Sequence, residues 1–146
     1  MIYIAHRGNY NGINKDDENH PDYILVALAK GYDAEIDVWW HKNQFYLGHD
    51  EPTHPVVPSF ILNRHMWCHA KNIEALEEMF YFNAHCFMHD QDMATLTSEN
   101  FIWTYRMKES TPRSICVLPE RTEQDFKNAA GICSDLVEKY KNDQTS

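Results

Sequence analysis

The fold is decided by residues 31–40, GYDAEIDVWW, which predict a buried β-strand from Ala34 to Trp40. Successive side chains of a strand point to opposite faces, so Glu35 and Asp37 share one face of the sheet. The apolar residues between and beside them predict that the opposite face is also buried. Two carboxylates that face the interior of a barrel repel each other unless a cation, a proton or an arginine compensates their charge. We favour a metal site over the alternative, the exposed polar face of an edge strand.

Short apolar, β-branched or aromatic runs recur along the rest of the chain, and stretches with helical spacing lie between several of them. Strands that alternate with helices predict a parallel sheet, and therefore an α/β fold. The predicted helices are Pro21 to Lys30, Ile73 to Phe82 with Asn72 as its N-cap, and, on weaker evidence, Glu120 to Ala130. The other predicted strands are Ile2 to Ala5, Phe45 to Gly48, Met66 to Ala70, Cys86 to His89, Phe101 to Tyr105, Ile115 to Leu118 and Gly131 to Ser134.

The length of 146 residues predicts a single domain, because a second core would leave both cores too small. We place this domain at residues 1–140 and expect the polar residues 141–146 to fray. The segment Val38 to Gly48 predicts a short hairpin. The proline-rich stretch Pro52 to Pro58 predicts an irregular loop.

The formal net charge is -9, from 22 acidic and 13 basic residues, and no basic stretch is present that could bind a polyanion. This charge argues against a nucleic-acid-binding module. The sequence contains no secretory signal and no apolar stretch near the roughly 20 residues that cross a bilayer. We therefore expect a soluble, cytoplasmic protein without a membrane span. The four cysteines each lie in an apolar run and are expected to be buried and reduced rather than paired in disulfides.

His6-Arg7-Gly8 directly follows the first predicted strand, where an α/β protein presents its binding residues. Arginine offers a planar fork to two phosphate oxygens, and histidine transfers protons near neutral pH. The glycine allows close approach of the backbone to a ligand. The alternative is a solvent-facing pair in a turn, and the tripeptide alone does not decide between the two.

Four further residues are candidates for the same rim. His49 closes the predicted hairpin and is a second candidate acid or base, unless it is a loop histidine held by its own neighbour Asp50. Glu18 precedes the first helix, as a further carboxylate or as an N-terminal cap. His69 and Lys71 share one face at the end of a strand, where the lysine either neutralises phosphate or is a surface residue.

Together these residues resemble the glycerophosphodiester phosphodiesterase family. The resemblance runs through His6-Arg7-Gly8, Glu18-Asn19, residues 31–38 and Leu47-Gly48-His49-Asp50, which agree with the family in order and spacing. Beyond residue 50, Lys71 is similar to a lysine of the family's next strand. Residues 131–135, GICSD, are similar to its closing strand.

The resemblance implies a reduced (β/α) barrel of TIM type with shortened or missing helices and about seven core strands, because typical barrels need about 250 residues. The insertion that family members often carry after the His-Asp motif is missing, since the next predicted strand begins at Met66, 16 residues after Asp50. That insertion normally helps to shape the substrate pocket. The substrate is therefore not fixed by the resemblance.

The resemblance also implies metal-dependent hydrolysis of a phosphodiester, with a glycerophosphodiester as the candidate substrate. It gives His6 and His49 as the acid/base pair, Arg7 and Lys71 as phosphate ligands, and Glu35 and Asp37 as ligands of Mg²⁺ or Ca²⁺. His69 stands where the family usually has a metal-binding carboxylate. Either His69 is a ligand and moves the preference towards Mn²⁺ or Zn²⁺, or the ligand is lost and Glu18 replaces it.

Three points stay open at this stage. A catalytically weak or inactive barrel that binds a phosphorylated ligand is the alternative to an enzyme. The segment His89-Asp90-Gln91-Asp92 has no assigned role. A barrel that has lost covering helices exposes apolar surface, so we expect self-association into a homo-oligomer.

Overall fold

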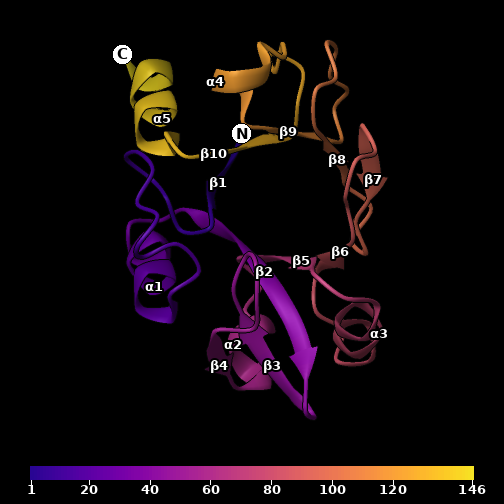
Figure 1. The fold of residues 1–146 in the computed structure, drawn as a ribbon. Helices are drawn as coiled ribbons and strands as arrows, with labels where there is room; N and C mark the ends of the chain where they lie inside the picture. Colours follow the sequence, from indigo (N-terminus) through magenta and orange to yellow (C-terminus); the bar gives the residue numbers. More distant parts are fainter.

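The computed structural model describes residues 1–146 and has a mixed α/β fold, in which a ten-stranded sheet curls round (Figure 1). Its strands are β1 (Ile2–His6), β2 (Asp33–His41), β3 (Gln44–Leu47), β4 (His54–Val56), β5 (Met66–Ala70), β6 (Cys86–Phe87), β7 (Ala94–Leu96), β8 (Ile102–Thr104), β9 (Ser114–Val117) and β10 (Gly131–Ser134). Its helices are α1 (Pro21–Ala29), α2 (Pro58–Ile61), α3 (Ile73–Tyr81), α4 (Pro119–Thr122) and α5 (Val137–Thr145).

Seven of the strands are parallel, in the order β6-β5-β2-β1-β10-β9-β8. The β2-β3-β4 branch and the β7-β8 pair are antiparallel. The two ends of the parallel series approach each other, because the Ser98 amide beyond β7 donates to the Cys86 carbonyl in β6 at 2.9 Å. The carboxyl ends of the parallel strands therefore gather at one rim (Figure 1).

Most alternate residues of the strands divide between two large buried clusters, and a third cluster of four buried residues includes Ala5 of β1, Ala27 of α1 and Val137 of α5. The outward-facing Ala34, Ile36 and Val38 of β2 pack with α1, α3 and β3 in a cluster of 15 buried residues. The inner cluster of eight buried residues draws on β1, β5, β6, β8, β9 and β10. Inside it, the Phe87 and Trp103 rings lie 4.4 Å apart and join the two ends of the curled sheet. Glu35 and Asp37 thus point inward from a strand that is buried on both faces.

Most of the predicted elements are confirmed within one or two residues. The α1 and α3 helices lie at the predicted places, and the Asn72 side chain accepts from the Ala75 amide as an N-cap. The β2–β3 hairpin turns through Lys42 and Asn43, both at positive φ. All four cysteines are buried and free.

The predicted helix from Glu120 to Ala130 is wrong. Helix α4 ends at Thr122, and Glu123 adopts a left-handed conformation with φ of 55°. The Gln124 side chain is then buried and donates to Thr104 Oγ1 at 3.0 Å and to the Glu109 carbonyl at 3.1 Å. These tertiary hydrogen bonds draw the segment inward and override its helical spacing.

Two further predictions differ from the structure. The loop expected from Pro52 to Pro58 contains β4, which pairs with β3. Of residues 141–146, which were expected to fray, 141–145 form the last turns of α5, where Gln144 accepts from the Tyr3 hydroxyl at 2.6 Å. This bond fixes the polar helix to the sheet despite its few apolar residues. No helix is both long and apolar enough to cross a membrane.

Candidate functional site

A pocket of about 850 Å³ opens at the carboxyl ends of the parallel strands. Seven of the eight predicted site residues line it, and Lys71 is the exception: His6, Arg7, Glu18, Glu35, Asp37, His49 and His69. The parallel strands explain this arrangement, since residues that follow neighbouring strands meet at one rim. Residues 6 to 69 are therefore brought together by the fold.

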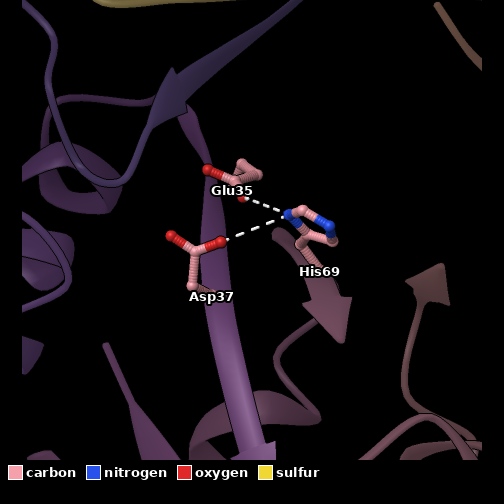
Figure 2. A group of neighbouring side chains, drawn as sticks. All are labelled: Glu35, Asp37 and His69. Atoms are coloured by element: carbon pink, nitrogen blue, oxygen red, sulfur yellow. Dashed lines mark ion pairs between the residues drawn. The ribbon is translucent and has the colours of Figure 1, made fainter. Parts of the chain in front are cut away.

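The centre of the site consists of two carboxylates and one imidazole. Glu35 and Asp37 lie on β2 and are almost completely buried, and His69 lies on β5 directly beside Asp37. His69 Nδ1 lies 3.2 Å from Asp37 Oδ1 and 3.7 Å from Glu35 Oε1. Figure 2 shows the three side chains pointing towards one another. The predicted metal ligands Glu35, Asp37 and His69 thus form one cluster.

The second oxygen of each carboxylate is engaged by the surrounding protein. The Arg7 amide donates to Glu35 Oε2 at 3.1 Å. Asn19 donates to Asp37 Oδ2 at 2.9 Å, and its own oxygen accepts from the Asp37 amide at 2.9 Å. Arg7 adopts a left-handed conformation with φ of 54° to present its amide there. These contacts orient Glu35 Oε1 and Asp37 Oδ1 towards His69.

Asp37 and His69 have strongly shifted pKa values. Burial opposes ionisation of Asp37, but the His69 hydrogen bond and the charges of Arg7, His69 and Lys71 prevail and lower its pKa far below the usual value. Burial likewise lowers the pKa of His69, but hydrogen bonds to Asp37 and Glu35 raise it to about 9. Without a metal, the His69 imidazolium is paired with both carboxylates and occupies the role that a metal cation would have.

The donor set fits a divalent cation. One ligand atom from each of Glu35, Asp37 and His69 lies within 4.8 Å of the other two. Two carboxylate oxygens and an imidazole nitrogen are ordinary ligands of such ions. Glu18, the predicted substitute ligand, lies outside this cluster: its carboxylate accepts from Arg7 Nη1 at 3.2 Å and from Asn9 at 2.9 Å.

His6 lies next to the cluster, opposite Glu35 in the β1–β2 register. Its Nδ1 is hydrogen-bonded to Asp135 Oδ1 at 2.8 Å, which leaves Nε2 free. Burial lowers the pKa of His6, but the Asp135 hydrogen bond and the Glu35 charge outweigh it and raise the pKa above its ordinary value. His6 is therefore held in one orientation as a proton donor or acceptor.

Asp135 follows β10 and is itself held on both oxygens. Oδ1 accepts from Asn9 at 2.8 Å, and Oδ2 accepts from Arg121 at 2.6 Å. The sequence analysis gave no role to Asp135, Asn9, Asn19 or Arg121. The sequence did contain a signal for Asp135, because this residue directly follows the predicted strand Gly131 to Ser134. If that strand is the parallel neighbour of the first strand, its end lies beside His6.

The predicted phosphate ligands are less free than expected. Arg7 is bound by two carboxylates, with Nη1 on Glu18 and Nε 3.2 Å from Asp37 Oδ2. Lys71 Nζ lies 3.9 Å from Asp37 Oδ1. Both cations compensate the buried acids in this structure.

His49 lines the same pocket but is held much more loosely. Its side chain is 44% exposed, and its only side-chain partner is Asp50, which is 92% exposed. No hydrogen bond joins His49 to His6 or to the carboxylate cluster. The structure therefore puts both predicted acid/base residues at one pocket but fixes only His6.

The far wall of the pocket contains residues of initially unassigned role. His89 and Asp90 line it after β6, and Tyr105 lines it after β8. The His89 carbonyl accepts from His69 Nε2 at 2.8 Å, and its own ring contacts the Asp92 carbonyl. Trp103 is buried in the inner core and also borders the pocket. The segment from His89 to Asp92 is thus connected to the site through His69.

Comparison of the chain with protein-family models, with curated proteins and with solved structures gave no match. The site is therefore interpreted from its own geometry.

Proposed function

We propose that this protein hydrolyses a phosphodiester, with a divalent ion bound by Glu35, Asp37 and His69 and with His6 transferring the proton. The observation that carries the proposal is the oriented His6 imidazole, bonded to Asp135 on Nδ1 and adjacent in register to the carboxylate cluster. An acid/base residue beside a cation site is what cleavage of an unreactive, negatively charged diester requires. The resemblance to glycerophosphodiester phosphodiesterases agrees with this chemistry.

His6 performs the proton transfer in this proposal. Asp135 holds the imidazole and stabilises its protonated form, so Nε2 would exchange a proton with one oxygen of the displacement, the attacking water or the leaving oxygen, and His49 would exchange a proton with the other. The bound divalent ion would polarise a non-bridging phosphate oxygen and stabilise the charge that develops as the diester bond breaks. Arg7 and Lys71 add positive charge at the same rim.

His49 is the second acid/base residue of the proposal. It lines the pocket together with His6, but its side chain is exposed and has only Asp50 as a side-chain partner. We infer that substrate binding supplies the orientation that Asp50 alone does not. This step separates His49 from His6, whose orientation exists before binding.

The fold is consistent with the proposal. Seven parallel strands curled around an inner core support a reduced (β/α) barrel of TIM type, with its site at the carboxyl ends of the strands. Helices α2 and α4 have four residues each, which fits the idea of shortened crossovers.

The test is a panel of glycerophosphodiesters and bis-p-nitrophenyl phosphate, assayed with Mg²⁺, Ca²⁺, Mn²⁺ and Zn²⁺. Wild type is compared with His6→Ala, and His41→Ala is the control because it removes an exposed histidine outside the pocket. We expect metal-dependent turnover that falls about 10²–10⁴-fold in His6→Ala and is unchanged in the control. A turnover rate that is the same with and without metal, or the same in wild type and His6→Ala, contradicts the mechanism.

A second function is favoured by one observation, the exposed and loosely held His49. In this alternative the pocket binds a phosphorylated ligand without cleaving it. Calorimetry that detects tight binding of a phosphodiester, combined with a ³¹P NMR spectrum free of product, would support binding over catalysis. The same spectra distinguish direct hydrolysis from an initial cyclic phosphate.

The predictions of a cytoplasmic location and of self-association remain part of the proposal. Helix α3 exposes Ile73, Phe80 and Tyr81 to 62%, 66% and 70%. Apolar side chains grouped on one helix are a plausible contact surface between copies. Sedimentation that detects only a monomer at micromolar concentration argues against the self-association.

A further inference from the structure

The surroundings of the His69 ring determine which of its two nitrogens carries the hydrogen in the neutral form. Nε2 lies 2.8 Å from the His89 carbonyl oxygen, which can only accept, so Nε2 carries a hydrogen. In the neutral ring the lone pair is therefore on Nδ1. That atom faces Asp37 Oδ1 and Glu35 Oε1.

The plane of the ring is fixed as well. His69 is stacked on Phe87, with the ring centroids 5.2 Å apart and an interplanar angle of 7°. Its backbone is paired with Asp37 in the β2–β5 register, and its side chain is 18% exposed. Rotation of the ring would break the bond to His89 and the stacking together. The ring is therefore oriented independently of the carboxylates.

Each of the three side chains is held through the atom that does not face the centre. Arg7 binds Glu35 Oε2, Asn19 binds Asp37 Oδ2, and the His89 carbonyl binds His69 Nε2. The remaining atoms, Oε1, Oδ1 and Nδ1, converge on one another. Metal sites in proteins characteristically have hydrogen bonds from surrounding residues that fix the orientation and the tautomer of each ligand.

We propose that His69 Nδ1 is the third ligand of a site with two carboxylates and one imidazole, and that this nitrogen makes the site selective for first-row ions such as Mn²⁺ or Zn²⁺ over Mg²⁺ and Ca²⁺. The inference rests on the proposed function for its role in catalysis, but the binding itself does not depend on it. Mg²⁺ and Ca²⁺ favour all-oxygen sites, whereas imidazole binds the later ions well. The competing role for His69 is a permanent imidazolium that replaces the ion.

Binding is measured on the full chain after chelation, without substrate. Calorimetry with each metal should give Kd values for Mn²⁺ and Zn²⁺ at least about tenfold below those for Mg²⁺ and Ca²⁺. His69→Glu, which restores three carboxylates, should lose this preference. The control is His65→Gln, because His65 is also paired with a β2 carboxylate, Asp33 at 2.7 Å, but borders a different pocket.

Electron spin-echo spectroscopy of bound Mn²⁺ detects the nitrogen directly in the wild type, so the result does not depend on whether a variant folds. We expect imidazole ¹⁴N modulation in wild type and in His65→Gln, and none in His69→Glu. Bound Mn²⁺ without ¹⁴N modulation, or no binding of any of the four metals, overturns the inference.

This experiment separates the inference from the proposed function. Nitrogen coordination in a protein that cleaves no diester leaves the metal site standing and removes the activity. Metal-dependent cleavage without nitrogen coordination leaves the activity standing and removes His69 as a ligand.

Discussion

His6 and His49 line the same pocket, yet they belong to two sides that differ in how firmly their side chains are held. The buried side consists of residues on or directly after parallel strands: His6, Glu35, Asp37 and His69, which line the pocket, and Asp135, which holds His6. The exposed side consists of exposed residues in connecting loops: His49, Asp50 and Asp90. On the buried side each functional group has at least one partner that is itself fixed. On the exposed side His49 has only Asp50.

The difference follows from the backbone that carries each side. The register between neighbouring parallel strands fixes which side chains lie next to each other. Asp37 and His69 are partners in the β2–β5 register and are therefore adjacent. Loops lack such pairing, so the positions of their side chains are less firmly determined. His49 and Asp50 lie in a loop of this kind. In the proposed mechanism, the sheet therefore orients the metal ligands and His6, whereas the loop that carries His49 is ordered by the substrate.

The largest expected effect is that of Asp37→Asn on the buried side. It removes one proposed metal ligand and the buried charge that Arg7 and His69 share, so that Arg7 keeps only Glu18 and His69 keeps only Glu35 as a counter-charge. We expect kcat/KM to fall about 10³-fold and the free energy of unfolding to fall by about 3–5 kcal/mol. Enzyme assays and urea denaturation measure the two losses.

The matched control is Asp50→Asn, which neutralises a 92% exposed carboxylate on the other side of the pocket. Its stability should stay within about 0.5 kcal/mol of wild type. Equal destabilisation by the two substitutions would remove the distinction between the sides.

The second prediction concerns the stability of the metal-free protein as a function of pH. The pKa of His69 is raised from 6.5 to about 9 in the folded state, because Asp37 and Glu35 outweigh the effect of burial. Its contribution is therefore fully present below pH 6.5 and is lost as the pH rises through about 9. The same ion pair lowers the pKa of Asp37, so the two effects are not added.

We expect the free energy of unfolding to fall by roughly 3 kcal/mol between pH 6 and pH 9.5. Urea denaturation at a series of pH values measures this change. His69→Gln should flatten the curve, whereas His49→Gln should leave it as in wild type. A wild-type curve that is flat across this range contradicts the buried ion pair.

The third prediction concerns Asp135, whose carboxylate raises the pKa of His6. Asp135→Asn removes that charge, so the pKa of His6 should fall and the acidic limb of the pH–rate profile should move to lower pH. We expect kcat to fall by about 10²-fold, because the ring loses its fixed orientation. A loss of activity without a shift of the limb would mean that Asp135 is only structural.

The smallest expected effect is that of His49→Ala. Because the side chain is 44% exposed and loosely held, its loss should leave the melting temperature unchanged. We expect kcat to fall by about tenfold, below the usual range for an oriented acid/base residue. Steady-state kinetics and thermal unfolding measure both. A loss as large as that of His6→Ala would show that the two sides are equally organised in the substrate complex.

Much of the buried side could be predicted from the sequence. The alternation around Glu35 and Asp37 indicates a strand with inward carboxylates, and His6 and His69 follow or end strands of their own. In a parallel sheet this is enough to bring them to one rim. Strand order was not needed, because all carboxyl ends share that rim.

The remaining features depend on contacts between distant parts of the chain. The bond from His6 to Asp135 spans 129 positions and exists because β10 pairs with β1. The left-handed Glu123 and the buried Gln124 end a helix that local spacing favoured. The loop that carries His49 has no periodic pattern, so the sequence could indicate its position but not its exposure.

The central claim is that a metal bound between β2 and β5 is needed for cleavage of a phosphodiester. The most direct measurement is ³¹P NMR of a glycerophosphodiester incubated with chelated protein and then with the same sample after Mn²⁺ is restored. We expect the resonance of the phosphomonoester product, or of a cyclic phosphate, to appear only after the metal returns, and not to appear with Asp37→Asn. Product formed at the same rate by the chelated protein, or no product in either sample, would contradict it.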